Sequence, residues 1–460
     1  ALSLAKVAPK NGGGEPSIAI SRKGELYVSY PGDAVEFYRS TNGGSTWVAG
    51  AHADEQSGDT TVNVDSSGAI YQSNLNVLVA PPDSLQADLY KSKDDGRHWV
   101  RGAGPVFGSN TTNNPFFVDR QWTDAYIAPH HTTDSADVYM AYHDFVPSQI
   151  WVAHSSDGGK TFAVPTDAIS SPVAEAYSFC DTIPGGLRVV QSGPHAGRVY
   201  VAWLAADPVM STVMGCNITQ LETFHTVWVG WSDDQGSTWT DQLVYDGGIG
   251  HDASALFADL TLDDRGNPYV AFAQNLNGEW DMYVMASFDN GTTWNGKSDG
   301  TGAPYKVNAD RGTHFFPAIA VGDPGKVDVA YIATSSVIPT LPYGKPLPGG
   351  VPDARWYLYF AQALDLTSGH PHWSVVRATP SPIHTGDVCV LGIFCVFPSS
   401  NRDLLDFIDL AVDPKGFGHV SYTNDQSAQS SGIWVANQTG GRSVYTQVLA
   451  KRVVQQRLGE

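Results

Sequence analysis

The chain has 460 residues and a formal net charge of −20, with 16% charged residues, 47 Gly and 28 Pro. Abundant turn residues suit many short strands joined by tight turns and suit long helices poorly. A polyanion repels nucleic acid and anionic membrane surfaces, so we expect neither as a partner, and an anionic ligand would need a local cluster of cations. No apolar run reaches the length that a membrane span requires.

A pair of strands around a turn recurs in chain order. The pairs, or the strands that end them, lie at Ser17–Tyr30, Val62–Tyr71, Val138–Tyr142, Val199–Trp203, Leu260–Phe272, Ala318–Tyr331 and Leu410–Tyr422. Seven such units predict an all-β chain whose residues 1–460 form a single β-propeller domain of seven four-stranded blades. Six blades with an appended hairpin are the alternative. An α/β fold is excluded because no segment has an apolar period of 3.6 residues.

A second pattern, Ser-x-Asp-x-Gly-x-Thr-Trp, follows five of these pairs. Its copies are Ser40–Trp47, Ser92–Trp99, Ser155–Phe162, Ser232–Trp239 and Ser287–Trp294, and degenerate forms lie at 364–373 and 437–445. The Asp or Asn side chain caps its own turn, and Gly supplies a positive φ, so the pattern predicts a tight hairpin turn between two strands.

This pattern resembles the Asp box, or BNR repeat, of the sialidase-like propellers, and the resemblance covers nearly the whole chain. It implies that the residues of these turns are structural. Sialidases hold the substrate carboxylate with three arginines and use a Tyr–Glu pair with an acidic Asp. This chain has Glu15-Pro16-Ser17 where an Arg-Ile-Pro tripeptide is expected, and seven blades instead of six. Among seven-bladed relatives it is most similar to lyases of uronate polysaccharides, including those that act on rhamnose–glucuronate linkages.

The four cysteines lie in irregular segments. We expect the pairs Cys180–Cys216 and Cys389–Cys395, an oxidising compartment and a secreted protein whose leader has been removed; four buried thiols in the cytosol are the alternative. No CxxC pair or zinc-finger spacing is present, so we expect neither a metal site nor a cofactor, with only a structural calcium ion left open. We expect a monomer.

The working face is predicted from loop length. The turns within strand pairs and the Asp-box turns are short and share one face of a propeller. The long segments 100–118, 164–186, 204–224, 240–255, 332–355 and 374–405 crowd the opposite face. Elaborate loops on a rigid scaffold commonly carry ligand chemistry, so we place the site there.

Charged, His and aromatic residues stand where strands open onto this face. As catalytic candidates we take His143, His314, Arg120 and Asp144. As substrate-binding candidates we take Arg402, Arg311, Asp119, Trp122, His251, Asp252 and Asp406. Glu15, Asp59, Asp181 and Asp403 occupy similar positions. Each also has a structural interpretation, in which Arg120 bridges neighbouring blades and His143 caps a strand end.

The favoured function is a secreted carbohydrate-active enzyme that cleaves a poly- or oligosaccharide beside an acidic sugar. In a uronate lyase, Arg120 or Arg402 would neutralise the carboxylate, and His143 or His314 would move the proton. A sialidase-like hydrolase would instead need two carboxylates about 5–9.5 Å apart, with Asp119, Asp144, Asp252 and Asp406 as candidates. A non-catalytic propeller that binds glycan or protein is the third alternative.

Overall fold

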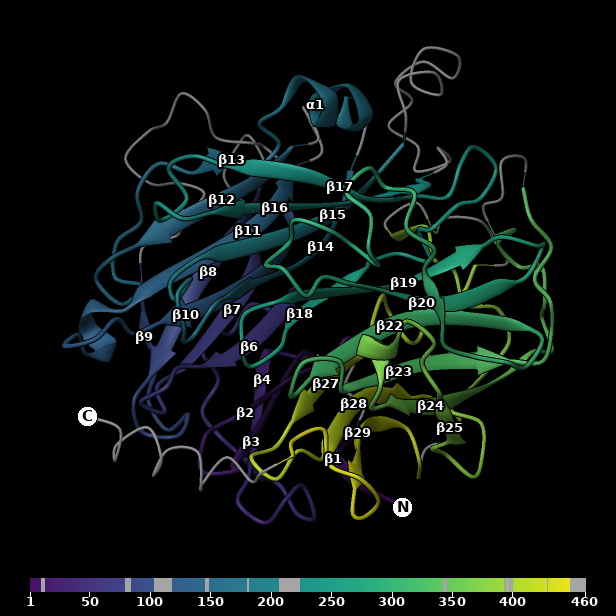
Figure 1. Ribbon diagram of the computed structural model, residues 1–460. Helices are drawn as coiled ribbons and strands as arrows, with labels where there is room; N and C mark the ends of the chain where they lie inside the picture. The colour runs from purple at the N-terminus through teal and green to yellow at the C-terminus, as the bar shows by residue number, and fades with distance from the viewer. Residues whose placement is uncertain are drawn as a thin grey trace.

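The computed structural model is an all-β propeller in which four-stranded antiparallel sheets surround one axis (Figure 1). It describes residues 1–9, 13–78, 84–102, 118–144, 149–179, 182–206, 224–341, 346–392, 395, 400–427 and 429–446. Besides strands, the described residues contain the short helix α1 (Pro172–Ser178) and the 3₁₀ turns η1 (Thr133–Ser135) and η3 (Leu366–Ser368). The predicted fold class is confirmed.

The first four blades follow one another along the chain, each from its innermost strand outward. Blade 1 is β2 (Ser17–Ile20), β3 (Leu26–Pro31), β4 (Val35–Ser40) and β5 (Val48–Ala49). Blade 2 is β6 (Thr60–Val64), β7 (Ile70–Leu78), β8 (Ser84–Ser92) and β9 (Val100–Arg101). Blade 3 is β10 (Val118–Tyr126), β11 (Asp137–Asp144), β12 (Ile150–Ser155) and β13 (Thr166–Asp167). Blade 4 is β14 (Thr182–Val189), β15 (Val199–Ala205), β16 (Thr226–Ser232) and β17 (Thr240–Asp246).

The last three blades complete the ring. Blade 5 is β18 (Asp259–Leu262), β19 (Pro268–Asn275), β20 (Trp280–Ala286) and β21 (Tyr305–Lys306). Blade 6 is β22 (Thr313–Val321), β23 (Val327–Thr334), β24 (Arg355–Ala363) and β25 (Ser374–Arg377), with β26 (His384–Thr385) also paired to β24. Blade 7 is β27 (Asp409–Val412), β28 (Gly418–Asn424), β29 (Gly432–Gln438) and, as its outer strand, β1 (Leu2–Pro9).

The ring therefore has seven blades, as the strand pairs predict, and not six with an added hairpin. A single parallel contact between Trp280 and Thr313 links the sheets of blades 5 and 6, which are otherwise separate antiparallel units. That the whole of residues 1–460 forms one domain stays a prediction.

The five predicted tight turns share one hydrogen-bond pattern. In the turn of blade 5, the Ser287 hydroxyl accepts from the Gly291 N–H at 2.8 Å and donates to Asp289 Oδ1 at 2.8 Å. The Asp289 carboxylate accepts from the Thr293 N–H and hydroxyl at 2.8 and 2.7 Å. The Trp294 ring, which is fully buried, donates to the Gly291 carbonyl at 3.1 Å. The same bond from the Gly N–H to the Ser hydroxyl recurs in blades 1 to 4. Each turn thus satisfies its own backbone, and its aromatic side chain is buried in blades 3 and 5 and half-buried in blades 1, 2 and 4.

Carboxylates on the innermost strands connect neighbouring blades at the axis. Asp124 of blade 3 accepts from the Val189 N–H of blade 4 at 2.8 Å. Asp259 of blade 5 accepts from the Ile319 N–H of blade 6 at 2.8 Å. Asp409 of blade 7 accepts from the Ile18 N–H of blade 1 at 2.9 Å. We call these three residues the axial aspartates; each bond fixes two adjacent inner strands.

A cation stands among the axial aspartates. Arg188, on β14, lines the central channel, which widens from a cavity of about 270 Å³ to one of about 490 Å³ toward the face of the tight turns. Burial raises the pKa of all three carboxyls, that of Asp259 to about 7, and the charge of Arg188 acts in the opposite direction. The guanidinium of Arg188 thus stabilises the buried negative charge of the axial aspartates in the channel.

The disulfide Cys389–Cys395 is present, as predicted. Cys180 and Cys216 lie outside the described residues, so their pairing stays a prediction. Among the helices of the described ranges, none has the length and apolarity needed to cross a membrane.

We expect Asp289→Ala to lower the free energy of unfolding by about 1 kcal/mol, because two donors of Thr293 lose their acceptor. Urea denaturation followed by fluorescence measures the change. The exposed carboxylate of Glu55, replaced by Ala, is the control and should shift stability by less than about 0.5 kcal/mol. Equal stability of Asp289→Ala and wild type would contradict the structural role of this turn.

We expect Arg188→Met to destabilise the protein by about 2 kcal/mol near pH 8, above the pKa of about 7 of Asp259, and by less near pH 5. The sign follows from the raised pKa of Asp259, since a raised pKa means that stability falls as pH rises through about 7. In Arg188→Met, the free energy of unfolding should fall more steeply as pH rises through about 7. Denaturation at both pH values measures it, with the exposed Arg265→Met as control; a pH-independent loss would contradict the pairing.

Candidate active site at the propeller mouth

The inner strands begin with a strained backbone on the face opposite the tight turns. Among the described residues, Glu15, Arg120, Leu256, Phe316 and Leu405 are non-glycine residues with φ between 45° and 64°, and each lies at or just before the start of an inner strand. In blade 3 the strain coincides with a register shift between Asp119 and Gln121. A bulge of this kind turns side chains away from the regular alternation, and such strain concentrates at functional sites. These strand starts therefore define the mouth of the propeller.

Four carboxyl groups from four strand starts meet at the mouth. Glu15 is placed to donate a hydrogen bond to Asp406, and Asp119 to Asp59. Burial, together with the charges of Asp59 and Asp406, holds the pKa of Glu15 well above its ordinary value of 4.5. Burial and the neighbouring Asp59 likewise hold the pKa of Asp119 well above its ordinary value. Each pair therefore combines a protonated acid with a partner carboxyl that can accept its hydrogen bond.

Two arginines border these carboxyl pairs. Arg402 donates to Asp406 and keeps 30% of its side chain exposed. Arg120 is only 2% exposed, and its guanidinium carbon lies 4.0 Å from the ring centre of Phe407, 4.7 Å from that of Trp122 and 5.9 Å from that of Phe257. Such contacts stabilise a buried cation through the faces of the rings. Among the described residues, Nε and Nη1 of Arg120 have no hydrogen-bond partner, so only part of the hydrogen-bonding capacity of its guanidinium is used.

A narrow cavity of about 30 Å³, room for one ordered water, lies among these groups. Its walls are Asp59, Asp119, Arg120, His143, Thr182, Ile183, Pro184, Leu256, Phe257, Gly392 and Asp406. His143 is buried and stands directly opposite Asp119 in the ladder between β10 and β11. Arg120 and Phe257 also line the central channel, so they separate the mouth from it.

The cavity thus brings together four of the sequence-predicted residues, Asp119, Arg120, His143 and Asp406, with Arg402 bonded to the last of them. Trp122 lies beside them as part of the ring cage.

Three other candidates support the backbone. Asp144 accepts from the Gln149 N–H at 2.8 Å and from Trp151 Nε1 at 2.9 Å, which links the end of β11 to the start of β12. Asp252 accepts from the Phe224 N–H at 2.9 Å. His251 bonds through Nδ1 to the Asn275 carbonyl at 3.1 Å. None of the three lines the mouth cavity.

The remaining candidates lie between blades 5 and 6, away from the cavity. His314 is fully buried, with Nδ1 at 2.7 Å from the Trp280 carbonyl and Nε2 at 3.3 Å from Asp310. The exposed Arg311 pairs with Glu279 through Nε at 2.7 Å. Asp181 lies outside the described residues.

Sequence reasoning missed the rings that hold Arg120. Phe257 and Phe407 each precede an axial aspartate by two residues, as Trp122 does, so the triplet aromatic-x-Asp occurs in blades 3, 5 and 7. Because side chains two apart on a strand share a face, this spacing could have indicated that rings and carboxylates both point to the axis. Glu15 and Asp59 were recognised as strand-start residues, but their pairing with Asp406 and Asp119 has no signal in the sequence.

No group of three or more His, Cys, Asp or Glu side chains within the described ranges is arranged to hold a metal ion. The side chains at the mouth can transfer protons, through the carboxyl pairs and His143, and can stabilise negative charge, through Arg120 and Arg402.

No protein-family model matches the chain. Among solved structures, it is similar to an ulvan lyase of polysaccharide lyase family PL25, with 14% identity over 98% of this chain and 99% of that one and a TM-score of 0.51. The same kind of enzyme bound to -[GlcA(1-4)Rha3S]- gives a TM-score of 0.50 with 14% identity over 98% and 99% of the chains. A Hadza microbial sialidase is similar at 14% identity, over 90% and 76% of the chains, with a TM-score of 0.46. The likeness to the lyase, which spans both chains, agrees with the β-propeller fold of the present structure.

We expect the stability of wild type relative to Glu15→Gln to fall as pH rises. The raised pKa of Glu15 means that its protonated form stabilises the folded state and that this contribution is lost as pH climbs through the folded-state pKa. Gln keeps the donor and never ionises. The difference between the two free energies of unfolding, measured by denaturation across the pH range, should therefore change steadily above the ordinary pKa of 4.5. A flat or opposite slope would contradict the buried pair.

Proposed function

We propose that the propeller mouth around this one-water cavity is the active site of a carbohydrate-active enzyme that breaks a glycosidic bond beside an acidic sugar, with the sugar bound outside the cavity and Glu15 or Asp119 as the proton donor. The observation that carries this proposal is the two pairs of buried carboxyl groups at the mouth, in each of which burial and the neighbouring carboxylate raise the pKa of one member. A buried carboxyl group with a raised pKa beside a second carboxylate is the arrangement that glycosidases use as acid and base or nucleophile.

In the hydrolytic reaction, Glu15 gives its proton to the glycosidic oxygen as the bond from that oxygen to the anomeric carbon breaks. A carboxylate of the Asp59–Asp119 pair takes a proton from water as the water oxygen bonds to the anomeric carbon. Arg402, which is partly exposed beside Asp406, and Arg120 supply positive charge for the carboxylate of the sugar. The arginines also offset the repulsion that a chain of net charge −20 exerts on an acidic substrate.

Elimination by a uronate lyase is the second candidate, and the position of His143 supports it. The imidazole lies in the same cavity as Arg120 and opposite Asp119. It would remove the proton from the carbon next to the uronate carboxylate; the electron pair would form the carbon–carbon double bond, and the departing glycosidic oxygen would take the proton of Asp119. The sequence favoured this reaction, whereas the carboxyl pairs, which the sequence does not show, favour hydrolysis.

One incubation separates the alternatives. The protein is mixed with uronate polysaccharides, including rhamnose–glucuronate polymers of the ulvan type, and separately with sialosides. Released reducing ends without the ultraviolet absorbance of an unsaturated uronate support hydrolysis. Both signals together support elimination. No release from any substrate overturns the enzymatic proposal in favour of a glycan-binding propeller.

We expect Glu15→Gln and Asp119→Asn each to lower kcat by about 10²–10⁴-fold, the usual contribution of a positioned general acid or base. A melting curve checks that each variant is folded. Glu175→Gln, which removes an exposed carboxylate on α1, is the control and should keep wild-type kcat. His143→Ala distinguishes the reactions, because elimination should lose about as much rate as with Asp119→Asn whereas hydrolysis should lose about tenfold or less. Full activity of Glu15→Gln and Asp119→Asn would contradict the proposal.

A further inference from the structure

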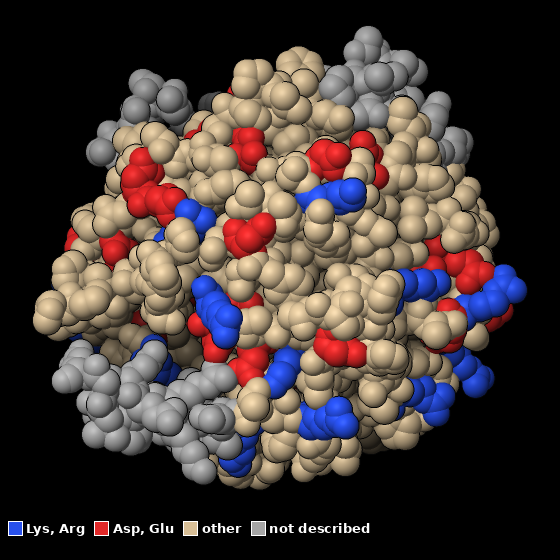
Figure 2. Space-filling model, in the orientation of Figure 1, with Lys and Arg blue, Asp and Glu red and all other residues tan. Residues whose placement is uncertain are grey.

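A groove with basic walls crosses the face opposite the mouth, between blades 1 and 2. It has a volume of about 330 Å³ and is lined by the turns after β2 and β6, the tight turn of blade 2, and η1. Its lining residues include Arg22, Lys23, Lys93, Ser66 and Thr133. Figure 2 shows acidic and basic side chains interspersed over the molecule, with basic side chains also in a recess at the lower left, over the part where Figure 1 draws blades 1 and 2.

Two of the three cations of this groove, Arg22 and Lys23, make no ion pair with the described residues, whereas the third, Lys93, pairs with Asp134. The two carboxylates in its lining, Glu25 and Asp95, both pair with Arg39, at 2.6 and 3.1 Å. Arg22 and Lys23 are exposed, and their side chains make no hydrogen bond or ion pair with the described residues. In a chain with 47 acidic and 27 basic side chains, two adjacent exposed cations stand out from the overall charge; the acidic neighbour of Lys23 is Glu25, whose carboxylate also pairs with Arg39.

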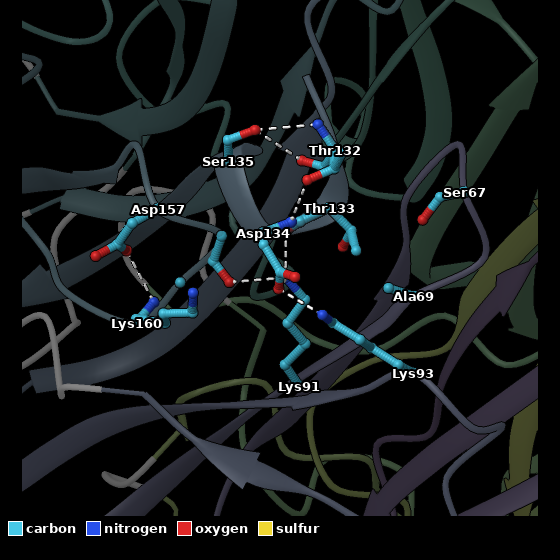
Figure 3. Close-up of polar contacts among 12 residues, drawn as sticks. Ser67, Ala69, Lys91, Lys93, Thr132, Thr133, Asp134, Ser135, Asp157 and Lys160 are labelled. Carbon is cyan, nitrogen blue, oxygen red and sulfur yellow. Dashed lines mark hydrogen bonds and ion pairs between the residues drawn. The ribbon is translucent and has the colours of Figure 1, made fainter. Parts of the chain in front are cut away.

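The far wall of the groove is rigid. Lys93 bonds to Asp134 of η1 at 2.5 Å. Lys91, 10% exposed, donates to the carbonyls of Thr133 and Gly158, which ties blade 2 to blade 3. Figure 3 shows Lys91 and Lys93 converging on Asp134, with Ser67 and Ala69 of the β6–β7 turn facing them. The groove is therefore held open by contacts that do not involve Arg22 or Lys23.

The near wall is equally fixed. The turn after β2 closes through the Gly24 N–H and the Ser21 carbonyl at 2.8 Å, and the Ser21 hydroxyl accepts from the Lys23 and Glu25 N–H groups. Arg22 and Ser66 also line the wide end of the central channel, so the two hollows are continuous. The channel end contributes Asp65, Asp263 and Asp264, which would keep an anionic ligand on the side of the groove.

We propose that this groove is a second binding site, distinct from the mouth, for an acidic polysaccharide whose carboxylate or sulfate groups pair with Arg22, Lys23 and Lys93. An extended chain suits an open groove between two turns, and repeated negative groups suit cations spaced along it. The site does not depend on the reaction at the mouth: it would retain a polymer on the protein whichever bond is cleaved, or if none is.

The test measures binding in the Glu15→Gln chain, so that turnover at the mouth does not enter. The probes are a heparin-derived oligosaccharide, a polygalacturonate oligosaccharide, neutral dextran of similar length, inorganic sulfate and duplex DNA. The variant is Arg22→Glu with Lys23→Glu. The matched control is Arg265→Glu with Lys415→Glu, because these exposed cations occupy the same turn in blades 5 and 7 and change the net charge equally.

We expect the Arg22/Lys23 variant to bind at least one acidic oligosaccharide about tenfold more weakly or worse, the control to bind within about twofold of the parent, and added salt to weaken binding. Dextran should not bind. Equal loss in both variants, or none in either, would overturn the site. Competition by inorganic sulfate at matched charge would assign the groove to a free anion, and equal binding of DNA through the same residues would assign it to nucleic acid; either result overturns the polysaccharide proposal. Because catalysis is not measured, an inactive mouth would leave this result unaffected.

Discussion

The arrangement of the propeller depends on one interaction repeated at its axis, a side-chain oxygen on one inner strand that accepts from the backbone N–H of the next. The axial aspartates make it between blades 3 and 4, 5 and 6, and 7 and 1. Ser17 makes the equivalent bond to Val62 between blades 1 and 2. Sheets packed face to face can slide, whereas these bonds fix the register of neighbouring inner strands and thereby the places where those strands begin.

The geometry of the mouth is set by this register of the inner strands. Each axial aspartate has an aromatic residue two positions earlier in the chain, so fixing the carboxylate also restricts the position of the ring. The three rings close around Arg120, which in turn stands beside the carboxyl pairs. The axis thus carries a cation held by rings at the mouth and a second one, Arg188, held by carboxylates in the channel. Buried negative charge at both levels is tolerated because a guanidinium or a retained proton is close by.

The fold was predictable because its signals are local. The turns at Ser40–Trp47 and its four counterparts satisfy their own hydrogen bonds within eight residues, and the strand pairs are apolar and aromatic segments joined by short turns. The candidate site was predictable only in part. Strand starts identified Asp119, Arg120 and Asp406, but His314 and Arg311 occupy a similar sequence position and lie between blades instead. The pairing of Glu15 with Asp406 depends on positive φ values at Glu15 and Leu405, and residue types alone do not specify such bulges.

Blade 7 combines strands from opposite ends of the described chain. Strand β1 pairs with β29 from Leu2–Gln438 to Pro9–Gly432, so the ring is completed by contacts between residues more than four hundred positions apart. Contacts of such long range are slow to form, because the entropy of closing the loop is lost before any bond is gained. During synthesis β1 is made first, and its edge has no partner until β29, the last of the described strands, has been made; the blades between them can assemble in order. Ring closure is therefore the stage at which this protein is most exposed to aggregation, and its folding rate depends on the most distant of its pairings.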